Sequence, residues 1–328
     1  MTKARVFSGM QPSGRFHLGN YLGALQNWVK MQEEFECIFS IVDWHALTSQ
    51  YEDTRGIREN IRQMALDWLS AGLDPEKCVI FLQSDVKEHA ELHLLLSMLT
   101  PLGWLERVPT YKDKLQQLGD QGKEINTYGF LGYPVLQTAD IILYKAAFVP
   151  VGVDQIPHVE LAREIVRRFN HLYGPVFPEP AVKLSEASLV PGLDARKMSK
   201  SYGNDISMSG EPEEIRAKVR MMVTDPQRVR KTDPGHPEVC VVYAFHKLFN
   251  PDICTEIETG CKAAAMGCVA CKQQLAERMI AHLAPVRERR LALEANPRLI
   301  DEILCAGAEK ARQIARQTMR EVKEAIKL

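Results

Sequence analysis

The chain has 328 residues, with 41 Lys and Arg against 42 Asp and Glu and a net charge of −1 at pH 7. A composition that is 45% hydrophobic and 25% charged predicts an ordinary globular protein with one large and one smaller domain. The near-zero charge excludes a general basic field, so any RNA binding must use local patches. Because no apolar stretch could span a bilayer and no signal-peptide region is evident, we expect a cytoplasmic protein without membrane contact.

The first half of the sequence alternates apolar strands with amphipathic helices. Short β-rich runs at residues 6–8, 37–43 and 79–82 predict buried parallel strands. Helical spacing of apolar residues predicts helices, in chain order, at residues 57–72, 86–99 and 159–169. The alternation predicts an α/β fold with a doubly wound parallel sheet, which places ligands at the carboxyl ends of the strands.

After residue 205 helical patterns replace the strands. Residues 308–328 carry apolar side chains at helical spacing among many charges and predict an amphipathic helix. We therefore expect a sheet-containing domain at 1–205 and a helical domain at 206–328, with the last helix packed back on the first domain.

A glycine-rich segment follows the first predicted strand. Gly9, Gly14 and Gly19 allow the backbone to approach a ligand, and the helix that starts near Asn20 offers an anion site at its N-terminus. His17 adds a hydrogen-bond donor there. The spacing matches neither a Walker loop nor the GxGxxG fingerprint, and a tight turn with a structural histidine is the alternative.

A second segment places two lysines and two serines on one loop. Lys197, Ser199, Lys200 and Ser201 surround Met198 after a turn-forming stretch. Two mobile cations with neighbouring hydroxyls suit a polyphosphate that is gripped only during reaction. The alternative for the loop alone is a solvated basic segment.

A third polar group follows the strand-like residues 148–151. Gly152, Val153 and Asp154 end this strand, and a carboxylate at that point can bind the hydroxyls of a ribose. The alternative role of Asp154 is a helix cap.

These segments together resemble a known family. Residues 17–20, His-Leu-Gly-Asn, resemble the HIGH signature of class I aminoacyl-tRNA synthetases, and residues 197–201 match its KMSKS signature letter for letter. Asn20 replaces the second histidine, as is usual in the tryptophanyl-tRNA synthetase family. Further segments that resemble this family are residues 7–14, 19–25, 43–48 and 139–144. The likeness covers essentially the whole chain.

The resemblance implies a Rossmann-like class I catalytic domain and an all-helical anticodon-binding domain. The implied reaction joins L-tryptophan to ATP, with Mg²⁺, and then transfers tryptophan to the 3′ end of tRNA(Trp); the implied assembly is a homodimer. The implied catalytic residues are His17, Asn20, Lys114, Lys197 and Lys200. The implied ATP-binding residues are Gln11, Pro12, Ser13, Gly19, Asn20, Gly152, Val153, Asp154, Lys197, Met198, Ser199, Lys200 and Ser201. For Lys114 a plain surface charge is the alternative.

Asp140 matches the indole-binding aspartate of the family. The indole N–H is only a donor, so a buried acceptor is its natural selector. An unpaired carboxylate in an apolar helix would be costly, and a helix cap or a salt bridge is the alternative role. The resemblance completes the tryptophan pocket with Phe7, His45, Tyr133, Gln137, Val149, Val151 and Gln155. Gln137 stands where many members carry methionine, which leaves the shape of that wall open.

Five of the eight cysteines lie between residues 240 and 271, whereas Cys37, Cys78 and Cys305 are expected to be buried small residues. Four thiolates can hold a zinc ion or an iron–sulfur cluster, and free thiols are the alternative. A subset of the family carries a [4Fe–4S] cluster on a similar C-x₆-C-x₂-C run. The resemblance implies as ligands Cys240, Cys261, Cys268 and Cys271. Cys254 is a possible substitute for the upstream ligand, and the role would be structural.

Two other functions are consistent with the sequence. Tyrosyl-tRNA synthetase is the nearest rival within the class. An inactive paralogue that binds tRNA or a protein partner is the rival outside it, but such a protein would have no chemical need for Lys197, Lys200, His17 and Asp140.

Overall fold

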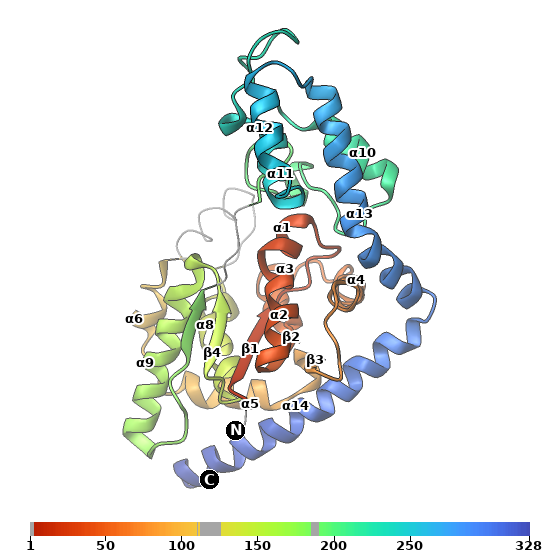
Figure 1. The fold of residues 1–328 in the computed structure, drawn as a ribbon. Helices are drawn as coiled ribbons and strands as arrows, with labels where there is room; N and C mark the ends of the chain where they lie inside the picture. Colours follow the sequence, from red (N-terminus) through yellow and green to blue (C-terminus); the bar gives the residue numbers. More distant parts are fainter. Residues whose placement is uncertain (1–2, 110, 112–125, 185–189) are drawn as a thin grey trace.

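The computed structural model describes residues 3–109, 111, 126–184 and 190–328. The described residues form one parallel sheet with strand order β3-β2-β1-β4-β5 and helices around it (Figure 1). The strands are β1 (Arg5–Met10), β2 (Glu36–Ile41), β3 (Cys78–Leu82), β4 (Phe148–Val151) and β5 (Ala181–Leu184). The order reverses between β1 and β4, so the expected doubly wound α/β sheet is confirmed.

Two details of the predicted strands are wrong. The second strand ends at Ile41 rather than at residue 43, because Asp43 already belongs to helix α3 (Asp43–Gln50). Strand β5 was not predicted; it is short, is only partly buried and contains Lys183, so it lacks the apolar run of a central strand.

Side chains of alternate strand residues fill two cores on opposite faces of the sheet. Val6 belongs to one core and Phe7 to the other, as the pleat of a strand requires. In the first core Trp28 stacks on Phe39 with ring centroids 4.5 Å apart. In the second, Phe7 stacks on Tyr144 at 5.4 Å. The sheet is thus buried on both faces, as a parallel sheet normally is.

The helices around the sheet include the predicted ones, with slightly different bounds, and several that were not predicted. A continuous helical segment runs through α1 (Leu18–Asn20), a π-helical stretch (Tyr21–Leu25) and α2 (Gln26–Glu34). The others are α4 (Ile57–Ala71), α5 (Glu88–Ser97), α6 (Leu102–Leu105), α8 (Tyr128–Ile142) and α9 (Ile156–Tyr173). Helix α4 ends as expected at Gly72, whose φ of 113° suits glycine.

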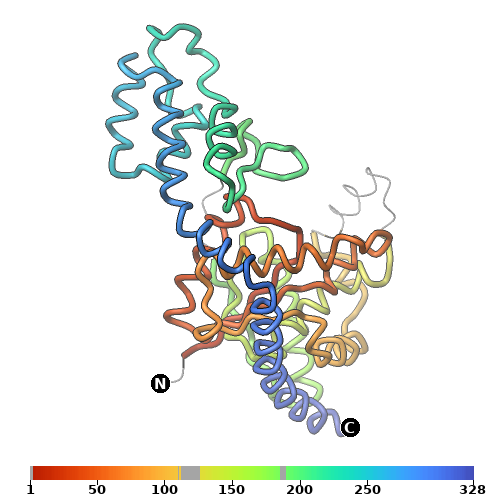
Figure 2. The backbone as a smooth tube through the Cα atoms, turned by 90° about the vertical axis from the view of Figure 1, so that its right-hand side faces the viewer, coloured from red at the N-terminus to blue at the C-terminus, as the bar shows by residue number. Residues whose placement is uncertain are grey.

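A group of helices lies above the sheet in Figure 1. It contains α10 (Pro212–Met221), α11 (Val241–Phe249), α12 (Cys254–Lys262) and the first part of α13 (Cys268–Glu294). Figure 2 shows that α13 continues from this group down to the sheet-containing region, where it packs against α4. One long helix therefore joins the two parts of the molecule.

The last helix, α14 (Pro297–Ile326), begins earlier than the predicted residue 308 and lies along the edge strand β3 (Figure 1). A Cβ atom at Gly307 would lie 1.8 Å from the carbonyl oxygen of Ile80, so helix and strand backbones touch. Cys305 on this helix is exposed, contrary to expectation, and borders a surface cavity. Across the described residues, every helix is too short or too polar to cross a bilayer.

Candidate active site

A cavity of about 260 Å³ opens at the carboxyl ends of β1 and β4, where the strand order reverses. All eight residues predicted for the amino-acid pocket line this cavity: Phe7, His45, Tyr133, Gln137, Asp140, Val149, Val151 and Gln155. Gln11, predicted to bind ATP, lines it as well. Val42 and His158 also contribute and were not predicted; Nε2 of His158 lies 3.1 Å from the Tyr133 hydroxyl. Residues far apart in sequence thus converge on one space.

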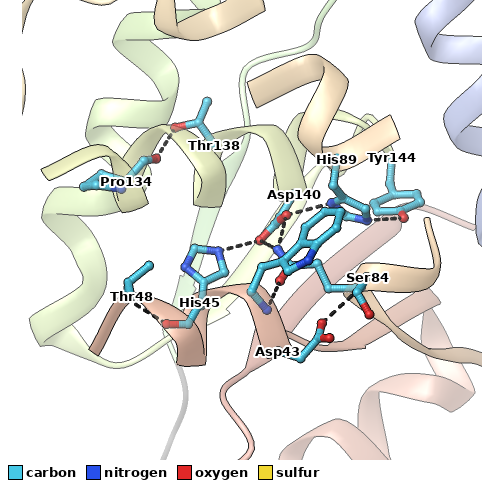
Figure 3. A network of polar contacts seen from close by, with 11 residues as sticks. Asp43, His45, Thr48, Ser84, His89, Pro134, Thr138, Asp140 and Tyr144 are labelled. Carbon is cyan, nitrogen blue, oxygen red and sulfur yellow. Dashed lines mark hydrogen bonds and ion pairs between the residues drawn. The ribbon is translucent and has the colours of Figure 1, made fainter. Parts of the chain in front are cut away.

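Asp140 is the buried acceptor of this cavity, with 1% of its surface exposed. Its Oδ1 accepts from Nε2 of Gln83 at 2.8 Å and from Nδ1 of His89 at 2.7 Å. Its Oδ2 accepts from Nε2 of His45 at 2.8 Å. Figure 3 shows the two histidines approaching the carboxylate from different sides. Asp140 is therefore neither unpaired nor a helix cap.

These donors keep Asp140 ionised. Burial alone would raise the pKa of the Asp140 carboxyl, but the interaction with His89 and the hydrogen bonds from His45 and His89 lower it below its ordinary value. An ionised acceptor binds an N–H donor more strongly than a neutral carbonyl does.

A second layer of contacts fixes the orientation of the His89 ring. Burial, and then the charge of Asp140, raise the pKa of Tyr144 well above its ordinary value, so its hydroxyl stays protonated. That hydroxyl lies 2.7 Å from Nε2 of His89. Asp140 and Tyr144 therefore hold the His89 ring through its two nitrogens. His89 and Gln83 were missed by sequence reasoning; the available signal was a polar residue directly after β3.

The glycine turn is built around His17. This residue caps α1: its Nδ1 accepts from the backbone N–H of Asn20, and the Asn20 side chain accepts from the backbone N–H of His17, both at 3.3 Å. A Cβ atom on Gly19 would lie 2.9 Å from Cε1 of His17, so only glycine leaves room for the ring. Gly14 has a φ of 81° and needs glycine for its backbone. Burial, followed by the charges of Lys200 and Lys197, lowers the pKa of His17, against an opposing effect of Asp205.

The lysine loop contacts the glycine turn directly. Nζ of Lys200 donates to the carbonyl oxygen of Ser13 and, at 2.8 Å, to that of Arg15. Burial lowers the pKa of Lys200, whereas Asp205 and Asp67 raise it. Met198 is buried on the same side, while Lys197, Ser199 and Ser201 remain at or near the surface. The two signature segments therefore form one site.

Asn204 shapes this loop and was not predicted. Its side-chain oxygen accepts from the backbone N–H of Ser199 at 2.8 Å. Its amide nitrogen donates to Asp194 at 2.7 Å and to the carbonyl of Lys197 at 3.2 Å. Asn204 is only 4% exposed, so these bonds are shielded from water.

The remaining predicted nucleotide residues follow β4. Val153 and Asp154 form a short 3₁₀ turn after Gly152, and Asp154 accepts from the Gln155 side chain at 2.9 Å. Because Gln155 lines the cavity, Asp154 stands at its rim. Pro12 lies on the glycine turn beside Ser13. Lys114 lies outside the described residues.

The four cysteines predicted as metal ligands line a second, small cavity in the helical group: Cys240, Cys261, Cys268 and Cys271. Cys254 is not part of this lining. Nη1 of Arg228 lies 3.8 Å from both the Cys261 and Cys268 sulfurs. Burial raises the pKa of Cys271 to about 12. Within the described ranges, no three His, Cys, Asp or Glu side chains converge on a point that suits a single metal ion.

Comparison with known proteins agrees with this geometry. A family model described as tRNA synthetases class I (W and Y) matches residues 1–284. A tryptophan–tRNA ligase of Thermotoga maritima is 49% identical and one of Aquifex aeolicus 46%, each match covering 99% of this chain and at least 99% of the relative. The structure of tryptophanyl-tRNA synthetase from Campylobacter jejuni complexed with ADP and tryptophan matches with a TM-score of 0.90 and 38% identity, covering 99% of this chain and 100% of that one.

A parallel sheet that carries a glycine turn and a lysine loop at the ends of its strands defines a class I aminoacyl-tRNA synthetase. Within that class, the chain belongs to the tRNA synthetases for W and Y.

Proposed function

We propose that the chain is a tryptophan–tRNA ligase. The observation that carries this proposal is the ionised Asp140, held by three donors at the wall of a cavity large enough for an indole and next to the signature segments. The two relatives named above are tryptophan–tRNA ligases, and the similarity covers nearly their whole length. The indole N–H would donate to Asp140 while the ring lies among Phe7, Val149 and Val151.

The reaction has two steps. A carboxylate oxygen of tryptophan attacks the α-phosphorus of ATP, and the bond to the β-phosphate breaks, which gives tryptophanyl-adenylate and pyrophosphate. A hydroxyl of the 3′-terminal adenosine of tRNA then attacks the tryptophanyl carbonyl, and AMP leaves. No enzyme nucleophile is needed, so the protein acts by positioning and by stabilising phosphate charge; Mg²⁺ enters with ATP.

We assign ATP to the glycine turn and the lysine loop. His17 and Asn20 would face the phosphates from the start of α1, and Gly19 would allow the close approach. The Lys200 side chain donates to the carbonyl oxygens of Ser13 and Arg15. From this position it would move to bind the departing pyrophosphate. The other residues that we assign to ATP are Gln11, Pro12, Ser13, Gly152, Val153, Asp154, Lys197, Met198, Ser199 and Ser201, with Lys114 as a further phosphate-directed lysine.

ATP–pyrophosphate exchange tests this function. Exchange should depend on tryptophan and ATP, and purified tRNA(Trp) should then be charged with tryptophan. Exchange that depends on tyrosine would identify the alternative substrate of the family. Absence of exchange with either amino acid would support an inactive paralogue.

We also propose that the four-cysteine cavity holds a [4Fe–4S] cluster. Its lining supplies four thiol ligands, and the Arg228 guanidinium beside two sulfurs suits the negative charge of a ligated cluster. A single zinc ion requires ligands that converge on one point, and the described side chains do not do so. A cluster binds its ligands at separate iron atoms and does not have this requirement. When bound, it would be a structural clip among α11, α12 and α13.

Iron, zinc and acid-labile sulfide on anaerobically purified protein test this assignment. About four irons with matching sulfide per chain are expected; one zinc or free thiols would overturn it. Cys240→Ser should lose the cluster, whereas Cys254→Ser should retain it, because only Cys240 lines the cavity.

We further propose that residues 206–328 form an anticodon-binding domain and that the enzyme is a cytoplasmic homodimer. Arg216, Arg220 and Lys272 border a cavity of about 420 Å³ between α10 and α13, where they can contact RNA phosphates. Leu94, Met98 and Leu102 are 55%, 74% and 62% exposed around α5 and α6 and offer an apolar face to a second copy. Light scattering should give a dimer mass, and Met98→Glu should lower it.

A further inference from the structure

A buried ion pair joins the long helix α13 to helix α4. Arg290 on α13 is 2% exposed and Asp67 on α4 is 0% exposed, and Nη1 of Arg290 donates to Oδ1 of Asp67. The same guanidinium donates through Nη2 to Oε1 of Gln63 and through Nε to Glu294 at 2.8 Å. All three guanidinium nitrogens are thus engaged, which fixes the planar group rigidly.

The second oxygen of Asp67 reaches the glycine turn. Oδ2 accepts from the backbone N–H of Phe16 at 2.6 Å, and Phe16 is itself 1% exposed. The next residue is His17, whose ring caps the helix of the ATP site. Only one carboxylate therefore separates α13 from the backbone that carries His17.

General stability does not account for this arrangement. Removing two charges from water costs several kcal/mol, and a buried pair often contributes no more than apolar residues of the same size would. Burial raises the pKa of Asp67, against the opposing effects of Arg290 and the Phe16 N–H, which is the sign of an expensive site. The hydrogen bonds of Arg290 and Asp67, by contrast, fix the relative orientation of the groups they join, which an apolar contact cannot do.

The path of α13 through the molecule suggests a role for these hydrogen bonds. The first part of this helix packs against α10 and α11, and its last part packs against α4 (Figures 1 and 2). Arg290 lies in this last part. We infer that Arg290 and Asp67 are positioning residues that set the Phe16–His17 backbone relative to α13, so that the geometry of the ATP site depends on the placement of the helical group. This inference rests on the proposed activity.

The expected effect is on turnover with ATP and not on tryptophan binding. Asp67 and Arg290 do not line the amino-acid cavity. A small displacement of catalytic groups can cost about 100-fold in rate. Arg290→Gln should therefore lower kcat for tryptophan-dependent pyrophosphate exchange by about 10- to 100-fold, and the tryptophan Kd should stay unchanged.

The double variant Asp67→Asn with Arg290→Gln separates positioning from folding. It removes both charges, so no unpaired charge remains buried, and its melting temperature should stay closer to that of the wild type than that of Arg290→Gln alone. Its kcat should remain low. Arg290→Lys keeps the charge but not the fork to Gln63 and should recover part of the rate.

Arg289→Gln is the matched control. Nε of Arg289 donates to the carbonyl of Ser70 at 2.6 Å, so it joins the same two helices without touching Asp67. This variant should keep kcat. Equal loss in Arg289→Gln, or wild-type kcat in the folded double variant, would overturn the inference. A wild-type enzyme without tryptophan-dependent exchange would instead refute the proposed function.

Discussion

Gly192 lies directly against Asn204: a Cβ atom at position 192 would be 2.3 Å from the Asn204 amide nitrogen. Asn204 cannot move aside without losing its bonds to Asp194, Ser199 and Lys197. The lysine loop therefore keeps its shape only while residue 192 has no side chain.

Gly192→Ala should lower kcat for pyrophosphate exchange by about 10-fold or more, because the displaced loop misplaces both lysines. Tryptophan affinity should not change. Gly103→Ala is the control, since nothing lies within 4 Å of a Cβ atom there. Unaltered exchange kinetics in Gly192→Ala would show that the loop does not need this packing.

Asp140→Asn should weaken tryptophan binding by about 10- to 100-fold, because a bond to an ionised acceptor becomes a bond to a neutral one. Titration calorimetry at pH 7.5 measures the change. Asp154→Asn, an equivalent change at the exposed rim, should leave the tryptophan Kd unaltered. Equal affinities in Asp140→Asn and the wild type would remove Asp140 from the indole site.

Lys200→Ala should lower kcat for adenylate formation by about 100-fold or more with little change in tryptophan affinity, since we assign this lysine to the phosphates and not to the amino acid. Pre-steady-state adenylate formation and equilibrium tryptophan binding separate the two effects. Lys218→Ala removes a lysine that binds the Gly203 carbonyl at 3.3 Å in the same segment and should be nearly silent. Equal losses of rate and affinity would mean that Lys200 acts in ground-state binding.

Acidification should destabilise the fold between pH 7.5 and 5.5. Burial lowers the pKa of His282, whose ring packs edge-on against Phe249 at 5.2 Å. A histidine in the unfolded chain has a pKa of about 6.5, so between pH 7.5 and 5.5 the unfolded chain binds more protons than the folded chain does. The free energy of unfolding therefore decreases as the pH is lowered. Urea unfolding should show a lower midpoint at pH 5.5. His282→Gln should reduce that difference, whereas His171→Gln, at an exposed position, should not.

Gly307→Ala should lower the free energy of unfolding by about 1–3 kcal/mol, because the new methyl group would overlap the backbone of Ile80. Neither backbone can yield without separating α14 from β3. Urea unfolding measures the loss, with Gly103→Ala again as the control. A stability equal to that of the control would mean that the helix can slide along the strand.

The sequence revealed those parts of the site that are contiguous. The glycine turn and the lysine loop are short signatures, and a strand–turn–helix pattern indicates where they lie. Asp140 was predicted as the indole acceptor only from its family context, since a carboxylate in an apolar helix also suits a salt bridge.

The support of the site was missed for a physical reason. Three supporting residues are buried and form hydrogen bonds to partners that are distant in sequence: Gln83, His89 and Asp67. The periodicity of apolar residues does not predict such long-range contacts. Arg290 stands in the charged run 287–290, which is typical of a solvated helix face; its burial depends on α4. Polar residues with buried partners become visible only when the packing is known.

The contact of α14 with β3 also has a consequence for biosynthesis. An uncovered edge strand offers free N–H and C=O groups to other chains. On the ribosome, β3 is made long before α14, and domains begin to fold as they emerge. Until α14 has been synthesised, the outer edge of β3 therefore lacks the helix that covers it in the folded chain.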